Sequence, residues 1–158
     1  MTDGVRIRLC ADSDLVALEA TEPPGAGIAR GILQHQAAGG VVYAAAWRQD
    51  RPLGTVVVDL NASCALELKH LFVQESVRGD GIGTSLCVWA EACAVQAGFA
   101  ALYLRVGADN DGARRLYERL GFTSTGRTIT TSYEYIDDDG RKRWATENDE
   151  TFVKVLPG

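Results

Sequence analysis

The segment that most constrains this chain is a glycine-rich turn, Val77-Arg78-Gly79-Asp80-Gly81-Ile82-Gly83-Thr84. Residues 66–73 precede it as a short run with few helix breakers, which predicts a strand. After the turn, apolar residues recur with the period of one helical face: Ile82, Leu86, Trp89, Ala90, Cys93 and Ala97. A strand, a glycine-rich turn and a helix in this order predict an anion-binding site.

The glycines at positions 79, 81 and 83 supply the chemistry for such a site. They remove the Cβ atoms that would block a ligand, and they let the backbone turn its N–H groups toward one point. The helix that follows adds unpaired N–H groups and the positive end of its dipole. A phosphate is the ligand that such a turn holds best.

Two common phosphate-binding motifs do not fit this turn. A Walker loop needs a lysine after its last glycine, and Thr84 follows Gly83. A dinucleotide fingerprint needs a third glycine at position 84 and an acid near the end of the next strand, but Gly107 and Ala108 precede the first acid, Asp109. A purely structural strand-to-helix turn is the remaining interpretation of the loop taken alone.

The pattern Arg78-x-x-Gly81-x-Gly83 resembles the acetyl-CoA signature of the GNAT (GCN5-related) superfamily of N-acetyltransferases. Upstream, residues 67–73 resemble the fourth strand of that family, and downstream, residues 110–122 resemble its Asn-x-x-Ala-x-x-x-Tyr-x-x-x-Gly-Phe segment. The resemblance implies one GNAT domain over residues 1–158, of the α/β (α+β) class. Its central sheet would be mixed and mostly antiparallel, with about seven strands and about four helices.

The resemblance also implies which residues bind acetyl-CoA, the co-substrate of the family. The loop amides would hold the diphosphate, with Arg78 as a charge at the edge or as a plain surface residue. The backbone after the fourth strand would bind the pantetheine arm like an added strand. Asn110 would hydrogen-bond that arm, and it would also cap a helix. The implied cofactor-binding residues are Leu71, Phe72, Val73, Arg78, Gly79, Asp80, Gly81, Ile82, Gly83, Thr84 and Asn110.

Two side chains are implied as catalytic, Tyr117 and Glu67. A phenol ionises near pH 10, so Tyr117 could give a proton to a departing thiolate, whereas its helical spacing alone would favour a core aromatic. Glu67 would accept the proton of the attacking amine, directly or through water. Lys69 could pair with Glu67 and make it a poorer base. No covalent acyl-enzyme and no metal site are expected.

The rest of the chain predicts alternating elements around this centre. We expect helices from Asp12, over residues 28–38, from Ile82 to Gly98, and from Asp109 or Asn110 to Leu120. We expect strands over residues 5–9, 41–47, 53–60, 66–73, 101–106, 123–136, 141–144 and 151–156, with a turn at residues 137–140. In the family, the region between the first two strands helps to form the acceptor site. This helix pair is therefore where we expect substrate choice to lie.

Composition excludes several classes of protein. The 158 residues carry a net charge of −5, which disfavours nucleic acids and acidic membranes as partners and favours a cationic substrate. No apolar run suits a signal peptide or a membrane span, so we expect a cytoplasmic protein. In that compartment Cys10, Cys64, Cys87 and Cys93 are expected to be small buried hydrophobes.

The leading hypothesis is an acetyl-CoA-dependent N-acetyltransferase that acts on a primary amine, in a small molecule or a peptide, through direct attack in a ternary complex. The first alternative is an acyl-CoA-binding module that regulates a partner without catalysis. The second is a nucleotide-binding oxidoreductase, motivated by the glycine-rich turn alone. Edge strands in this architecture could pair two subunits into a homodimer.

Overall fold

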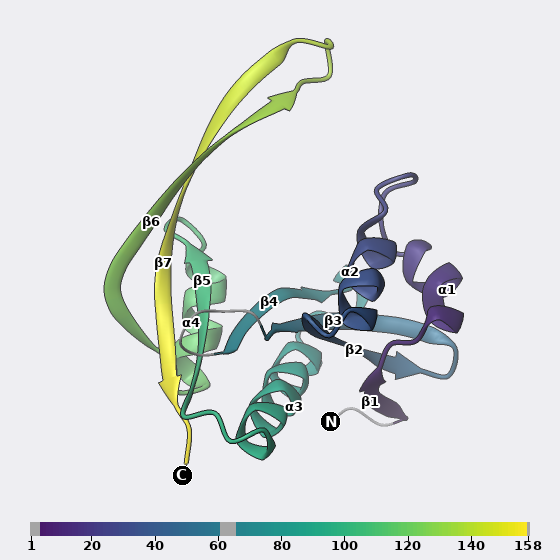
Figure 1. Cartoon of the computed structure of the whole chain (residues 1–158), viewed down its shortest axis with the longest axis vertical. Coiled ribbons are helices and arrows are strands. Elements are labelled where there is room, and N and C mark those ends of the chain that lie inside the picture. Colours follow the sequence, from purple (N-terminus) through teal and green to yellow (C-terminus); the bar gives the residue numbers. More distant parts are fainter. Residues whose placement is uncertain (1–3, 61–65, 158) are drawn as a thin grey trace. The chain divides into compact units, whose positions relative to one another are not determined.

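The structure is a computed structural model that describes residues 4–60 and 66–157. Seven strands and four α-helices in this part of the chain confirm the predicted fold class. The chain divides into two compact units, one of residues up to Leu102 together with those from Val155 onward, and one of Tyr103–Lys154. Figure 1 shows the elements of each unit. None of the described helices is both long and apolar enough to cross a membrane.

The first unit is built on four strands in the order β1-β2-β3-β4, all antiparallel to their neighbours. Their bounds are β1 Val5–Leu9, β2 Val41–Arg48, β3 Arg51–Asp59 and β4 Leu66–Val73. The strand expected over residues 41–47 is confirmed as β2. An uninterrupted apolar run is typical of a strand covered on both faces, and every residue from Tyr43 to Trp47 is buried.

Helices cover both faces of these strands. The helices α1 (Leu15–Glu19) and α2 (Ile28–Ala37) lie on one side of β2 and β3, and α3 (Ile82–Gln96) lies on the other (Figure 1). A Cβ atom added at Gly54 of β3 would lie 3.1 Å from Leu86 Cδ1 and 3.3 Å from Ile82 Cγ2 of α3. Gly54 therefore lets α3 pack closely on the sheet, and α3 carries the glycine-rich loop at its start.

The core under α1 and α2 joins the short N-terminal helices to the central strands. Its members are Cys10, Leu18, Ala29, Leu33, Tyr43, Ala45, Trp47 and Val57. On α3, the buried residues are Ile82, Leu86, Cys87, Ala90 and Ala94. Of the predicted stripe, Ile82, Leu86 and Ala90 are buried and Trp89 and Cys93 are half-buried. The prediction of Ala97 was wrong, because the helix ends at Gln96 and this residue is exposed.

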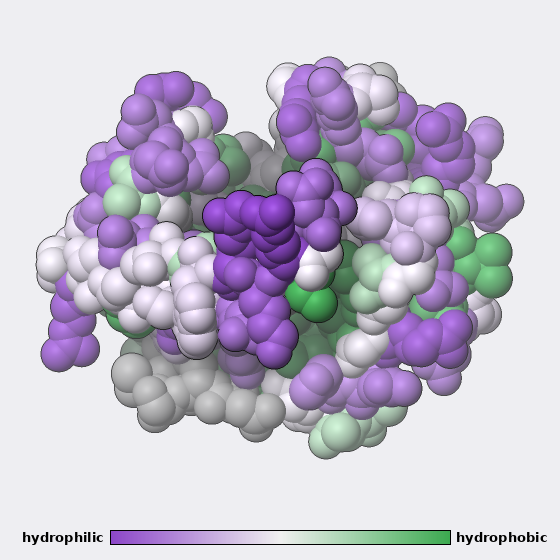
Figure 2. Space-filling view, turned by 90° about the horizontal axis from the view of Figure 1, so that it is seen from above, coloured by the Kyte–Doolittle hydropathy of each residue, from purple (hydrophilic) through white to green (hydrophobic). Residues whose placement is uncertain are grey.

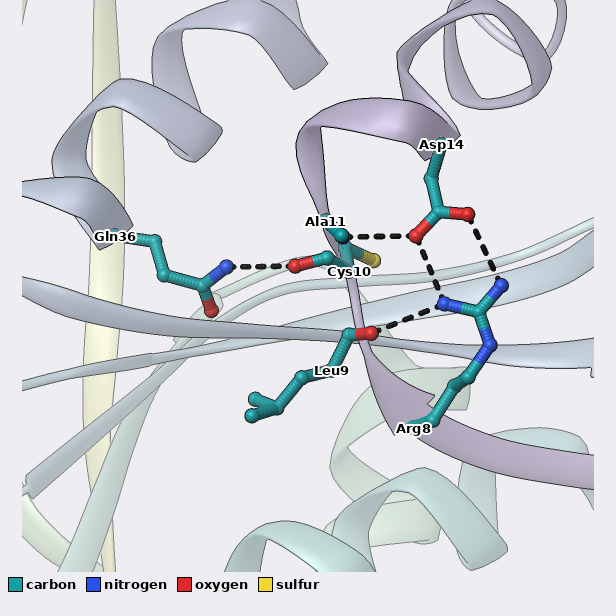
Figure 3. A network of polar contacts seen from close by, with 6 residues as sticks. All are labelled: Arg8, Leu9, Cys10, Ala11, Asp14 and Gln36. Atoms are coloured by element: carbon teal, nitrogen blue, oxygen red, sulfur yellow. Dashed lines mark hydrogen bonds and ion pairs between the residues drawn. The ribbon is translucent and has the colours of Figure 1, made fainter.

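A polar network fixes the segment between β1 and α1 (Figure 3). Both terminal nitrogens of Arg8 donate to the carboxylate of Asp14, at 2.8 and 3.0 Å, and the Ala11 N–H donates to the same carboxylate at 2.8 Å. From α2, the Gln36 side chain donates to the Cys10 carbonyl at 2.8 Å and accepts the Tyr43 N–H at 2.7 Å. The network ties β1 and the helix pair to β2.

We expect Asp14→Asn to lower the free energy of unfolding at pH 7 by about 1 kcal/mol, the usual contribution of a partly exposed charged pair. The hydrogen bond from Arg8 lowers the pKa of Asp14 below its ordinary value. Because the folded-state pKa is the lower one, the stabilisation is present above about pH 4 and is lost as the pH falls through the folded pKa.

Denaturant titrations at several pH values between about 7 and 3 check this expectation. The wild type and Asp14→Asn should converge at the acidic end, and Asp12→Asn, a change to an exposed neighbour, should follow the wild type throughout. A difference between wild type and Asp14→Asn that stays constant with pH would show that charge does not stabilise this segment.

The second unit has its strands in the order β5-β7-β6. The bounds are β5 Ala101–Gly107, whose first two residues belong to the first unit, α4 Asp111–Arg119, β6 Thr123–Ile136 and β7 Lys142–Val155. The two short strands predicted over residues 141–144 and 151–156 are one continuous strand, so that prediction was wrong. The polar residues between them resembled a loop, yet they continue the pairing with β6.

The turn predicted at residues 137–140 is confirmed. The Asp137 carboxylate accepts the N–H groups of Asp139 and Arg141 at 3.0 and 2.9 Å, and Arg143 Nε lies 2.8 Å from it.

Every residue of β6 is exposed. On the face of the molecule in Figure 2, hydrophilic residues predominate and smaller hydrophobic patches lie between them.

Candidate active site

Strand β4 is irregular where it approaches the glycine-rich loop. Its pairing with β3 shifts register, since Val57 faces Lys69 but Thr55 faces Phe72. β4 therefore holds one more residue than β3 across this step, which is a β-bulge. Because of this bulge, side chains beyond Lys69 do not continue the simple two-residue alternation of the strand. A bulge leaves backbone groups outside the ladder, as the predicted binding of an extended arm at residues 71–73 would need.

The glycine-rich loop leads from a short 3₁₀ turn, Glu75–Val77, into α3. Gly79 and Gly81 have φ angles of +89° and +82°, in the left-handed region that favours glycine. Gly81 is the N-cap of α3, and no side chain caps this helix. The N–H groups of the first turn of α3, from Ile82 to Thr84, therefore lack intrahelical acceptors.

The Arg78 side chain links the loop to the end of β4 by a hydrogen bond. Its Nε donates to the Val73 carbonyl at 3.2 Å, and the residue is exposed. The guanidinium carries five N–H donors, so one bond to Val73 leaves others for an anion. Both interpretations of Arg78 made from the sequence, a surface charge and a charge at the edge of the loop, are compatible with this position.

A diphosphate fits the chemistry of this loop. Cβ atoms added at Gly79 and Gly81 would meet no atom within 4 Å, so open space lies where a ligand would approach. The 15-residue α3 directs the positive end of its dipole toward the same place. The predicted contacts of Gly79, Asp80, Gly81, Ile82, Gly83 and Thr84 with a coenzyme would use these main-chain donors.

Glu67, the second residue of β4, is a buried acid. The residue is 5% exposed, and its Oε1 lies 3.6 Å from Lys69 Nζ. Lys69 makes its shorter contact elsewhere, donating to Asp59 Oδ2 at 2.8 Å. The predicted pairing of Glu67 with Lys69 is thus present but longer than a hydrogen bond, and Asp59 takes the lysine's direct hydrogen bond.

Helix α4 of the second unit carries the other two predicted site residues. Asn110 is its N-cap and accepts the Ala113 N–H at 3.1 Å through its side-chain oxygen. The cap interpretation is therefore confirmed, and Asp109 is not the cap. Tyr117 is 9% exposed, and its ring packs edge-to-face on Phe122 with 5.9 Å between the ring centroids. Its ring belongs to the core of this unit, as helical spacing predicted.

A cavity of about 350 Å³ lies in the first unit beside the bulge of β4. Its walls come from the α1–α2 connection, α2 and the three strands β2 to β4. The lining residues are Thr21, Glu22, Pro23, Ile28, Ile32, Tyr43, Thr55, Leu71 and Phe72. It brings the predicted residues Leu71 and Phe72 together with the helix pair in which the sequence located substrate choice.

Apart from Leu71 and Phe72, sequence reasoning named none of the lining residues of this cavity as site residues. Glu22 is the clearest example, because both of its carboxylate oxygens accept N–H groups at the start of α2, those of Ile28 and Ala29, each at 3.0 Å. Tyr43 stands between two valines and three alanines in β2, a signal that could have drawn attention to it. Burial raises the pKa of the Tyr43 phenol, which therefore stays protonated at neutral pH.

The cysteines offer no nucleophile in the described residues. Cys10 and Cys87 are buried, as expected, whereas Cys93 is only half-buried, and Cys64 lies outside the described residues. Burial raises the pKa of the Cys10 thiol to about 12, so this thiol is protonated and unreactive near neutral pH.

Known proteins resemble this chain in sequence and in fold. The sequence model described as the acetyltransferase (GNAT) family matches residues 12–122. An uncharacterised N-acetyltransferase of Methanocaldococcus jannaschii is 37% identical over 78 residues, which are 46% of this chain and 34% of that protein. The match thus spans about a third of the length of that curated relative.

Solved structures share the fold. An N-acetyltransferase from Staphylococcus aureus matches with a TM-score of 0.76 at 17% identity, over 97% of this chain and 99% of that chain. A GNAT family acetyltransferase from Elizabethkingia anophelis, solved with acetyl-CoA bound, matches with a TM-score of 0.69 at 17% identity, over 98% of this chain and 100% of that chain. At this identity the likeness concerns the fold.

Proposed function

Because the chain belongs to the acetyltransferase (GNAT) family, we propose that it moves an acetyl group from acetyl-CoA to a primary amine by direct attack in a ternary complex. The observation that carries this proposal is the loop from Arg78 to Thr84. Its two left-handed glycines and the uncapped start of α3 suit a diphosphate, the group by which acetyl-CoA would be held. The likeness in fold to a protein solved with acetyl-CoA supports the same ligand.

When bound, acetyl-CoA would supply the activated acetyl thioester. The residues of this chain would then have two tasks at the reacting atoms. Glu67 accepts the proton that the substrate ammonium must lose before its nitrogen can attack. Tyr117 gives a proton or a hydrogen bond to the thiolate that leaves. One C–S bond breaks and one C–N bond forms. The nitrogen loses its second proton as the adduct collapses, which balances the proton gained by the thiolate, and no oxidant or reductant takes part.

The test combines coenzyme binding with product formation. Acetyl-CoA should raise the melting temperature of the protein by linkage, and NAD(P)H should not. With a panel of amines, free thiol should appear together with the N-acetylated amine in equal amounts, the latter followed by mass spectrometry. Binding of acetyl-CoA without turnover of any amine would favour the regulatory acyl-CoA-binding module instead.

We expect Glu67→Gln to lower kcat at pH 7 by at least about tenfold, because a neutral amide cannot accept the ammonium proton. The deficit should shrink toward pH 10, where an alkylamine loses its proton to water without help. Glu134→Gln, on the exposed strand β6, is the matched control and should behave as the wild type. A deficit that is the same at every pH would assign Glu67 a structural role.

The cytoplasmic location and the homodimer expected from the sequence stay predictions.

A further inference from the structure

The cavity beside β4 has a composition that restricts what it can hold. Five of its lining residues are wholly apolar: Pro23, Ile28, Ile32, Leu71 and Phe72. Tyr43 adds an aromatic ring, and its residue is only 3% exposed. A volume of about 350 Å³ lies at the lower end of the range for small-molecule pockets. The cavity therefore suits a compact group with an apolar body.

Charge around the cavity is the second restriction. Among its described lining residues, Glu22 alone is charged, and none is basic. The two oxygens of Glu22 already accept the N–H groups of Ile28 and Ala29, and the positive end of the α2 dipole offsets its charge. A carboxylate on the ligand would find no cation here, and a second ammonium would find only this engaged acid.

On the basis of the proposed function, we infer that the acceptor is a compact primary amine with an uncharged aliphatic or aromatic body, whose ammonium is its single charge. The body occupies the apolar cavity between α2 and β4. Amino acids with a free carboxylate and polyamines are poor acceptors, because each would place a second charge against apolar walls that offer it no free partner. The net charge of the protein favoured a cationic acceptor, and the lining of the cavity restricts that acceptor to one with a single positive charge.

The experiment compares three amines of equal carbon-chain length as acceptors for the wild-type protein: hexylamine, 6-aminohexanoate and 1,6-diaminohexane. Their far ends are neutral, anionic and cationic. The kcat/KM for hexylamine should exceed that for each of the other two by at least about tenfold, because a buried charge without a partner is strongly disfavoured. From propylamine to hexylamine, each added methylene should raise kcat/KM by up to about fourfold, which corresponds to ~0.8 kcal/mol of apolar burial.

Two variants of one residue locate the effect in the cavity. Ile32→Lys should lower kcat/KM for hexylamine and raise it for 6-aminohexanoate, whose carboxylate gains a cation. Ile32→Gln, similar in length but neutral, should lower kcat/KM for hexylamine without the gain for 6-aminohexanoate. Stabilisation of both variants by acetyl-CoA in a thermal melt checks that each one is folded.

The outcomes separate this inference from the proposed function. If acetyl-CoA binds and the carboxylated or diamino compound is the better acceptor, the inference is overturned while the proposed function stands. Preference for the diamine, lost in Glu22→Gln, would identify Glu22 as an anchor for a second ammonium. If no amine of any class is acetylated, the proposed function fails, and the inference fails with it.

Discussion

Tyr117→Phe should lower kcat by about 100-fold or more, the range in which a positioned proton donor contributes to catalysis. The variant keeps the ring and its edge-to-face packing on Phe122, so the melting temperature should stay close to that of the wild type. Acetyl-CoA affinity should change by less than about twofold, because the proposed role of the hydroxyl is at the departing sulfur and the diphosphate is held elsewhere. Single-turnover measurements of thiol release give the comparison.

The matched control for this variant is Tyr135→Phe, another loss of a phenol hydroxyl in the same unit. Tyr135 lies on the exposed strand β6 and is 43% exposed. Its variant should turn over like the wild type. If Tyr117→Phe also kept full activity, Tyr117 would serve only as a packed aromatic residue of the core. Another group would then have to protonate the leaving thiolate.

Gly81→Ala should raise the Kd for acetyl-CoA by at least about tenfold, or ~1.4 kcal/mol. Two effects combine in this loss. Gly81 has a φ of +82°, which an alanine adopts only under strain, and the new Cβ would enter the open space in front of α3. Isothermal titration with acetyl-CoA measures the change.

Gly98→Ala is the control that separates strain from obstruction. Gly98 lies just after the other end of α3, has a φ of +84° and likewise has no atom within 4 Å of an added Cβ. Both variants should lose stability by about 1 kcal/mol, but Gly98→Ala should bind acetyl-CoA as the wild type does. Equal affinity losses in the two variants would mean that global destabilisation, and not the loop, accounts for the effect.

Local sequence signals predicted the parts of the fold that depend on local rules. The glycines and the apolar period located the turn before α3, because left-handed backbone and helical periodicity are properties of neighbouring residues. Capping, which acts over three residues, predicted the start of α4 at Asp109 or Asn110, and Asn110 is the cap. The same signals predicted the ends of the four strands of the first unit to within a few residues.

Features that depend on distant pairing were out of reach of these signals. The bulge in β4 follows from its register with β3, and no residue in 69–72 marks it. The long strand β7 is held by pairing with β6, which overrode its polar composition. The cavity gathers residues from Thr21 to Phe72, so its walls emerged only when five elements were brought together.

The NMR signals of the main-chain amides of residues 79–84 test most directly whether the loop binds the diphosphate of acetyl-CoA. Titration of ¹⁵N-labelled protein with acetyl-CoA should give its largest shifts at Gly79, Gly81, Gly83 and Thr84, because their N–H groups would become donors to phosphate oxygens. The amide signals of residues 128–148, in the hairpin of the second unit, should not shift. Saturation of the protein with acetyl-CoA while the loop amides kept their free positions would contradict the account.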